Sequence, residues 1–123
     1  GLCIAHNVPL IGVNHLQAHV AALFIDHDVA LPMLCLLVSG GHTQLIWVEA
    51  IDSMEIIGST QDDAAGEAFD KAAKLMGLGY PGGPLVDKLA KEGDATKYPF
   101  PDAHTEGLNF SFSGIKTSLL YLE

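Results

Sequence analysis

Continuous runs of apolar residues predict β-strands in the first half of the chain. Residues 33–38 (MLCLLV) form an uninterrupted apolar run, which is typical of a strand covered on both faces of a sheet. The turn at residues 39–42 (SGGH) separates this run from a second one at residues 43–48, and glycines between two such runs predict a β-hairpin. Shorter runs predict further strands at residues 9–13, 54–58 and 110–112.

Elsewhere the apolar residues recur every three or four positions, which predicts helices. Asn14 is a preferred N-cap residue and begins such a pattern, which extends to about residue 25. Residues 64–76 carry one apolar face, with a supportive Glu67–Lys71 pair beside it. The same spacing predicts two more helices, from Pro84 to near residue 93 and from Ser113 onward. Strands and helices mix without an internal repeat, so we expect one α/β unit.

The composition fits a buried α/β protein, because 49% of the 123 residues are hydrophobic and 17% are charged. Fifteen acidic and six basic residues give a net charge of −9, which argues against a nucleic-acid docking surface on this segment. The two cysteines show no disulfide or metal spacing, so a reducing cytoplasm is expected. No apolar run approaches the length of a membrane span. The chain begins without Met and stops within a helical pattern, so we expect an internal piece of a longer protein.

His15 and His19 lie one helical turn apart, the spacing with which a helix offers two nitrogen ligands to one metal ion. Two exposed helix histidines without a ligand are the alternative, and a metal site would need a third ligand. In zinc peptidases of the H-E-x-x-H type, a glutamate directly follows the first histidine and acts as general base. Leu16 occupies that position here, which argues against a peptidase.

The turn at residues 39–43 (SGGHT) is a candidate anion site, because glycines let the backbone approach a ligand and a turn's N–H groups can bind phosphate. A hairpin that needs glycine for positive φ is the alternative. His42 and Thr43 add donors beside the two glycines, which favours phosphate.

Several carboxylates lie between residues 62 and 87. Asp62 and Asp63 stand where a helix begins, and helix capping would explain both. Asp70 is a candidate acceptor for ribose hydroxyls, or an ordinary surface residue. Residues 79–84 (GYPGGP) require an unusual backbone path, either as a tight connection or to approach a flat ligand, with Asp87 placed to grip a sugar.

Four motifs taken in order are far more specific than each alone. NVPLIGVNHLQAHV, LLVSGGHTQL, DDAAGEAFDKAAKLMGLGYPGGP and FSFSGIKT closely resemble the tRNA threonylcarbamoyladenosine synthesis transferase family, formerly called the O-sialoglycoprotein endopeptidase or glycoprotease family. The resemblance covers essentially the whole chain. It implies an actin-like, sugar-kinase-like ATPase (ribonuclease H-like) fold, of which residues 1–123 would be an internal segment spanning parts of two lobes, with N- and C-terminal parts missing.

The reaction implied by the resemblance is transfer of a threonylcarbamoyl group from threonylcarbamoyl-AMP to N6 of adenosine 37 in tRNAs that read codons beginning with A. By this resemblance His15 and His19 match two ligands of one divalent metal ion, iron or alternatively zinc. The residues that match the ligand-binding positions are Leu37, Val38, Ser39, Gly40, Gly41, Asp70, Gly83 and Asp87. The partners implied in bacteria are a paralogous actin-like subunit and a P-loop ATPase.

The chain departs from the family pattern in two ways. Asn14 and Gln17 stand where the family commonly has His and Glu, which should tune the surroundings of the metal site without removing it. The family's third metal ligand, an Asp, and an adenine-contacting Asn belong to a region beyond Glu123, so these residues alone should be inactive. A metallopeptidase and an O-carbamoyltransferase of related fold are the rival functions; the unbroken FSFSGIKT and GYPGGP motifs favour the transferase.

Overall fold

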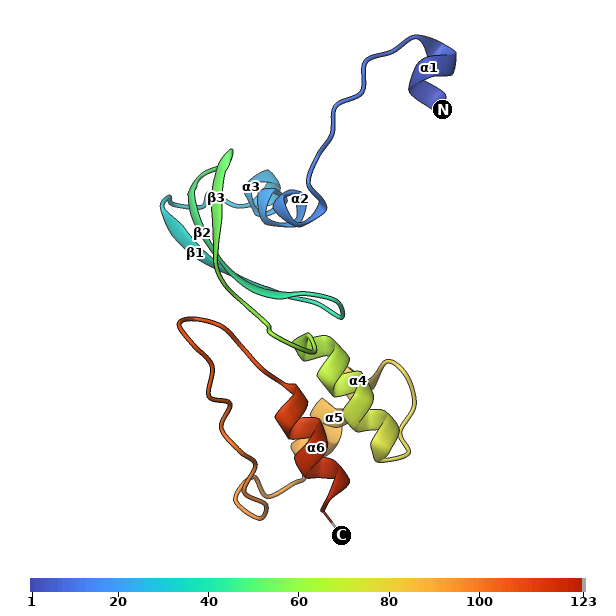
Figure 1. Cartoon of the computed structure of the whole chain (residues 1–123), viewed down its shortest axis with the longest axis vertical. Coiled ribbons are helices and arrows are strands. Elements are labelled where there is room, and N and C mark those ends of the chain that lie inside the picture. Colours follow the sequence, from blue (N-terminus) through green and yellow to red (C-terminus); the bar gives the residue numbers. More distant parts are fainter. Residues whose placement is uncertain (123) are drawn as a thin grey trace.

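The computed structural model describes residues 1–122, which form six helices and three strands (Figure 1). In chain order they are α1 (Leu2–His6), α2 (His15–Ala21), α3 (Leu23–Asp26), β1 (Met33–Val38), β2 (Thr43–Ala50), β3 (Ser53–Ser59), α4 (Ala65–Leu75), α5 (Gly82–Ala90) and α6 (Ser113–Leu120). Figure 1 shows a sheet with α2 and α3 beside it, a separate group of α4, α5 and α6, and α1 apart from both. Within residues 1–122 no helix is long and apolar enough to cross a membrane.

The sheet is a three-stranded antiparallel meander in the order β1-β2-β3. The predicted hairpin is confirmed: Val38 pairs with Thr43 beside the glycine turn, and Met33 pairs with Val48 at the other end. The third predicted strand is also confirmed, one residue longer at each end than the pattern indicated. Register shifts in the β2–β3 pairing locally increase the twist of the sheet.

The hydrophobic core lies between α2, α3 and one face of the sheet. Val20 of α2 and Ile46 and Val48 of β2 are almost fully buried there. Cys35 packs against this core, and burial raises the pKa of its thiol.

The opposite face of β1 is open, with Leu34, Leu36 and Val38 each more than half exposed. The prediction of a strand covered on both faces is therefore wrong for the described residues, because alternate side chains of a strand point to opposite faces and helices cover only one of them.

Two predictions about the N-terminal part are wrong. Residues 9–13 form no strand; they are an exposed, extended connection between α1 and α2, because no neighbouring strand pairs with them among residues 1–122. The helix predicted from Asn14 to about residue 25 is split at Ala22 into α2 and α3. The amide of Ile25 donates to the carbonyl of Ala22 at 3.2 Å, a tighter turn than the α-helical pattern.

Helices α4 and α5 pack through small residues. A Cβ atom at Gly82 would lie 2.6 Å from the Cβ of Ala73 and 2.8 Å from the carbonyl oxygen of Phe69, so α5 can approach α4 this closely only with glycine there. Helix α5 starts two residues before Pro84 and ends near residue 90, earlier than the pattern indicated.

The strand predicted at residues 110–112 is wrong apart from one isolated bridge between Phe110 and Thr60. The chain turns into α6 immediately afterwards, because the amide of Phe112 donates to the carboxylate of Asp62 at 2.8 Å rather than to a neighbouring strand.

Candidate functional site

The histidine pair stands at the start of α2, where the sequence builds a firm helix end. The side chain of Asn14 accepts hydrogen bonds from the amides of Leu16 at 3.0 Å and Gln17 at 3.1 Å, so the predicted N-cap is confirmed. The Nε2 atoms of His15 and His19 lie 3.2 Å apart, and their rings meet edge to face with centroids separated by 4.5 Å. Both imidazoles are exposed, and their Nε2 atoms face each other.

This spacing suits a shared metal ion. Two nitrogens that bind one zinc ion at about 2.0–2.1 Å in tetrahedral geometry are roughly 3.4 Å apart. The observed Nε2–Nε2 separation of 3.2 Å needs little adjustment to reach that value. Among residues 1–122, however, no group of three His, Cys, Asp or Glu side chains is placed to hold a metal ion. Among the described residues the pair therefore supplies two potential nitrogen ligands, fewer than a metal site needs.

The glycine turn between β1 and β2 is organised by one hydroxyl. The Oγ atom of Ser39 accepts hydrogen bonds from the amides of Gly41 at 3.3 Å and His42 at 3.0 Å, and the amide of Ser39 donates to the carbonyl of His42 at 2.8 Å. In this conformation three of the turn's amides, those of Ser39, Gly41 and His42, therefore bond within the turn itself. The turn presents fewer backbone donors to an anion than its sequence suggests.

Gly40 and Gly41 are not required by backbone strain. Neither residue has the positive φ that would favour glycine, and a Cβ atom at either would meet nothing within 4 Å. The alternative explanation, a hairpin that needs glycine for its dihedral angles, is therefore wrong. The two glycines keep the space in front of the turn free of side chains.

That space is a cavity of about 420 Å³ between the turn and the histidine pair. It is lined by His15, Leu16, His19, Leu37, Val38, Ser39, Gly40, Gly41 and His42. The fold thus brings together two predicted metal ligands and five predicted ligand-binding residues from separate elements. His42 also lines the cavity. From the sequence it was only a possible donor, and its position directly after the two glycines was the signal that could have identified it.

The remaining predicted residues lie on α4 and α5 and do not line this cavity, although the start of α4 contacts the glycine turn. The amide of Ala65 donates to the hydroxyl of Thr43 at 2.9 Å, and the amide of Gly66 donates to the carbonyl of Ser39 at 3.2 Å. A Cβ at Gly66 would lie 2.7 Å from that carbonyl oxygen, so glycine is needed for α4 to begin against the turn. Asp70 follows one helical turn later.

Asp70 and α5 are tied together. The Oδ1 atom of Asp70 accepts a hydrogen bond of 2.7 Å from the amide of Gly82, the first residue of α5. Asp70 also lines a second cavity of about 320 Å³. Gly83 lies on α5 and lines neither cavity, nor does Asp87, whose carboxylate pairs with Lys91 at 3.0 Å. The structure therefore ties Asp70 to the start of α5 and leaves Gly83 and Asp87 outside the two cavities.

Asp62 has a role that the sequence did not reveal. Its carboxylate accepts hydrogen bonds from the hydroxyls of Ser111 and Ser113 at 2.5 and 2.8 Å and from the amides of Phe112 and Ser113 at 2.8 and 3.3 Å. Partial burial would raise the pKa of this carboxyl, but these hydrogen bonds outweigh it and lower the pKa to about 2. Asp62 thus caps α6, about fifty residues away, and not the helix that follows it.

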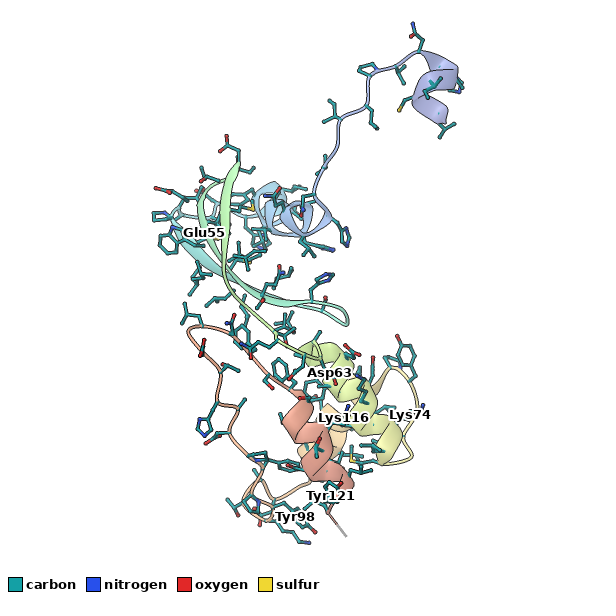
Figure 2. The ribbon with its side chains drawn as sticks, in the orientation of Figure 1. Glu55, Asp63, Lys74, Tyr98, Lys116 and Tyr121 are labelled. Carbon is teal, nitrogen blue, oxygen red and sulfur yellow. The ribbon has the colours of Figure 1, made fainter. Side chains whose placement is uncertain are left out.

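Asp63 is the charged centre of the helical group. Its Oδ1 atom lies 2.6 Å from the ammonium of Lys71, and its Oδ2 atom lies 3.9 Å from that of Lys116 on α6. Figure 2 shows Asp63 at the start of α4 and Lys116 on the neighbouring helix. Lys71 also pairs with Glu67 at 2.8 Å, as the sequence predicted, and the Asp63 and Glu67 carboxylates raise the pKa of its ammonium. These contacts hold α4 and α6 together near the start of α4.

The fold and the candidate site describe an α/β protein with a cavity between a histidine pair and a glycine-rich turn. The sequence profile of the tRNA N6-adenosine threonylcarbamoyltransferase family matches residues 1–123, and the chain belongs to this family. The resemblance noted in the motifs is thereby confirmed.

Curated relatives carry the name tRNA N6-adenosine threonylcarbamoyltransferase. One from Clostridium perfringens is 58% identical over 123 residues, which cover 98% of this chain and 36% of the relative. Another from Christiangramia forsetii is 54% identical over 124 residues, with the same coverage. A third from Geotalea daltonii is 57% identical over 116 residues, 93% of this chain and 34% of the relative. The chain spans about a third of the length of these relatives.

Proposed function

We propose that this chain is part of an enzyme that transfers the threonylcarbamoyl group of threonylcarbamoyl-AMP to N6 of adenosine 37 in tRNAs reading codons that begin with A. The observation that carries this proposal is the 420 Å³ cavity in which the His15–His19 pair faces the glycine turn. We further propose that residues 1–123 are an internal segment of a two-lobed, actin-like protein. The antiparallel three-stranded meander followed by helices is consistent with such a lobe.

In this proposal His15 and His19 supply two ligands to one divalent metal ion, iron or zinc, and the rest of the full-length protein supplies the others. Such an ion polarises a carbonyl oxygen as a Lewis acid. The Asn14 cap fixes the first turn of α2 and so keeps both imidazoles on one side of the helix. Only neutral imidazole binds a metal, so acidification weakens binding.

The glycine turn places the acyl-adenylate. Because Gly40 and Gly41 carry no side chains, a phosphate can approach the backbone of the turn. Asp70 stands one helical turn beyond the contact between Gly66 and Ser39, which corresponds to about 6 Å along α4. Its Oδ1 atom is held by Gly82, so the other oxygen remains to accept a hydrogen bond from a ribose hydroxyl.

Two rival functions have weaker support. A metallopeptidase needs a general base beside the first histidine, and Leu16 lies in that position on the wall of the cavity. An O-carbamoyltransferase of related fold would use the same kind of cavity for a small-molecule acceptor. The family named for the tRNA modification enzyme matches the whole chain, which favours tRNA as the acceptor. We expect residues 1–123 alone to be inactive, and the full protein to work with a paralogous subunit and a P-loop ATPase.

The test replaces the histidine pair in the full-length protein, in cells that lack their own copy of the enzyme. His15→Ala and His19→Ala should abolish N6-threonylcarbamoyladenosine in digested tRNA, measured by mass spectrometry, and should lower the metal content of the purified protein. His27→Ala is the matched control, because His27 is exposed and does not line the cavity. It should leave both quantities at the wild-type level.

Modification at the wild-type level in folded His15→Ala and His19→Ala proteins would overturn the metal role of the pair. A peptide-cleavage assay with and without chelator separates the peptidase alternative. Cleavage that depends on metal, in a protein that does not modify tRNA, would replace our proposal with that one.

A further inference from the structure

His42 presents an exposed imidazole from a turn whose backbone is fixed. The carbonyl of His42 accepts hydrogen bonds from the amide of Ser39 at 2.8 Å and from the hydroxyl of Ser39 at 3.2 Å. The amide of His42 donates to the same hydroxyl oxygen at 3.0 Å. These bonds involve only the backbone of His42, so replacement of its imidazole should leave the turn in place.

The imidazole lines the cavity of about 420 Å³ between the turn and the histidine pair. Of the described residues that line this cavity, only His15, His19 and His42 carry a basic nitrogen. The proposed function commits His15 and His19 to a metal ion, and a nitrogen bound to metal cannot also accept a proton. The hydroxyl of Ser39 is a weak base and already donates to the carbonyl of His42. His42 is therefore the base that remains.

Carboxylates at the start of α4 do not compete with the imidazole for this role. Asp63 and Glu67 hold the ammonium of Lys71 at 2.6 and 2.8 Å. Asp70 accepts a hydrogen bond of 2.7 Å from the first amide of α5. None of these three carboxylates lines the cavity. A general base must reach the proton that it removes, directly or through one water, so the position of His42 decides in its favour.

We propose that His42 is the general base of the transfer to tRNA. This inference rests on the proposed function and adds a catalytic residue to it. The nitrogen N6 of adenosine attacks the carbonyl carbon of the threonylcarbamoyl group, and a C–N bond forms. The bond from that carbon to the phosphate oxygen breaks, and AMP leaves with its electron pair. The imidazole of His42 takes the proton that N6 loses and then releases it to water.

Removal of this proton is a demanding part of the reaction. The lone pair of an adenine amine is delocalised into the ring, which makes the neutral amine a poor nucleophile. Its attack produces a nitrogen that carries a positive charge until the proton departs. A base that takes the proton while the bond forms avoids this charge, and such assistance commonly contributes about 100- to 10,000-fold in rate.

The experiment uses the full-length protein with its partner subunits and compares wild type with His42→Ala, His42→Gln and His104→Ala. The rate of tRNA modification is measured in a single turnover at saturating threonylcarbamoyl-AMP, the Kd for AMP by isothermal titration calorimetry, and the metal content by elemental analysis. Both His42 variants should lower the rate about 100-fold and leave the Kd and the metal content within about twofold of wild type. His104→Ala is the matched control and should keep the wild-type rate, because His104 is exposed and does not line the cavity.

Chemical rescue separates a base from a residue that only supports the structure. In His42→Ala the lost side chain leaves room for free imidazole, which should restore part of the rate. Glutamine fills that room, so imidazole should leave the rate of His42→Gln unchanged. Lack of rescue in folded His42→Ala would overturn the role as base.

A loss of rate of less than about tenfold in folded His42→Ala would overturn it as well. So would a raised Kd for AMP at an unchanged single-turnover rate, which would make His42 a phosphate ligand, or a loss of metal, which would make it a metal ligand. If His42→Ala does not fold, the rate and the metal content of His42→Gln decide. A wild-type protein that leaves tRNA unmodified would refute the proposed function too, whereas an active wild type with an active His42→Ala refutes only the base.

Discussion

The sheet half and the helical half of this molecule are stabilised by different forces. In the sheet half, Val20, Ile46 and Val48 form a cluster from which water is almost excluded. In the helical half the buried hydrophobic residues are small, Ala64 and Ala73, and an apolar cavity of about 310 Å³ remains between the helices. Burial of apolar surface is therefore the main source of stability in the sheet half. In the helical half, close backbone contacts, hydrogen bonds and ion pairs are the main source.

The charges divide in the same way. All six basic residues are lysines located between positions 71 and 116, whereas nine of the fifteen acidic residues precede position 71. The ion pairs of the described residues accordingly lie in the helical half, where Asp63 alone faces two lysines. The packing of α4, α5 and α6 therefore depends on the positions of a few carboxylates and glycines. Four substitutions test this difference.

The largest effect is expected for Gly82→Ala. The new Cβ would lie 2.6 Å from the Cβ of Ala73, so α5 must move away from α4 and lose the Asp70 contact. Overpacking of this kind should lower the free energy of unfolding of the full-length protein by about 3 kcal/mol, measured by urea unfolding. Gly83→Ala is the control, because its Cβ would be 4.0 Å from that of Phe69. Equal losses in both variants would contradict the close-approach explanation.

Val48→Ala addresses the sheet half. Val48 is fully buried, so removal of two methyl groups should lower the free energy of unfolding by about 2 kcal/mol. Amide hydrogen exchange should quicken in β1, β2 and β3 and remain slow in α4. Val8→Ala, at a half-exposed position in the N-terminal connection, should change stability by less than about 0.5 kcal/mol. Faster exchange spread evenly over both halves would show that the two are not separately stabilised.

Asp62→Asn tests the cap of α6 and gives the helical half a pH dependence. The carboxyl pKa is lowered from 3.8 to about 2 in the folded state, so its stabilising effect is complete above pH 4 and is lost as the pH falls through 2. At pH 7 the variant should lose about 1 kcal/mol, a typical value for an N-cap. The difference from wild type should shrink near pH 2. A difference independent of pH would mean that the charge of Asp62 contributes nothing to the cap.

The smallest effect is expected for Lys91→Ala. The pair between Lys91 and Asp87 spans 3.0 Å, but both side chains are about 70% exposed. Exposed pairs contribute little, so the free energy of unfolding should change by less than about 0.5 kcal/mol at 0.15 M salt. A larger loss in urea unfolding would show that surface charge, and not only the Asp62 and Asp63 contacts, holds the helical half together.

Local patterns predicted much of the fold. The apolar runs at residues 33–38 and 43–48 and the glycines between them gave the hairpin, and Asn14 gave the start of α2, because these features act through neighbouring residues. The strand predicted from the short apolar run at residues 9–13 is wrong, since a strand forms only where another strand pairs with it. The same reason explains why residues 110–112 make a single bridge.

For the candidate site, too, local features could be predicted from the sequence and contacts between distant segments could not. The sequence by itself determined which residues are candidates for the site: the i,i+4 spacing of His15 and His19, the glycines of the turn, and Asp70 could all be chosen from local patterns. Only the tertiary structure decided that the pair faces the turn across one cavity, that Asp62 caps a helix fifty residues away, and that His42 lines the same cavity as the pair. Helical spacing and turn chemistry are local, whereas contacts between distant segments depend on how the elements pack.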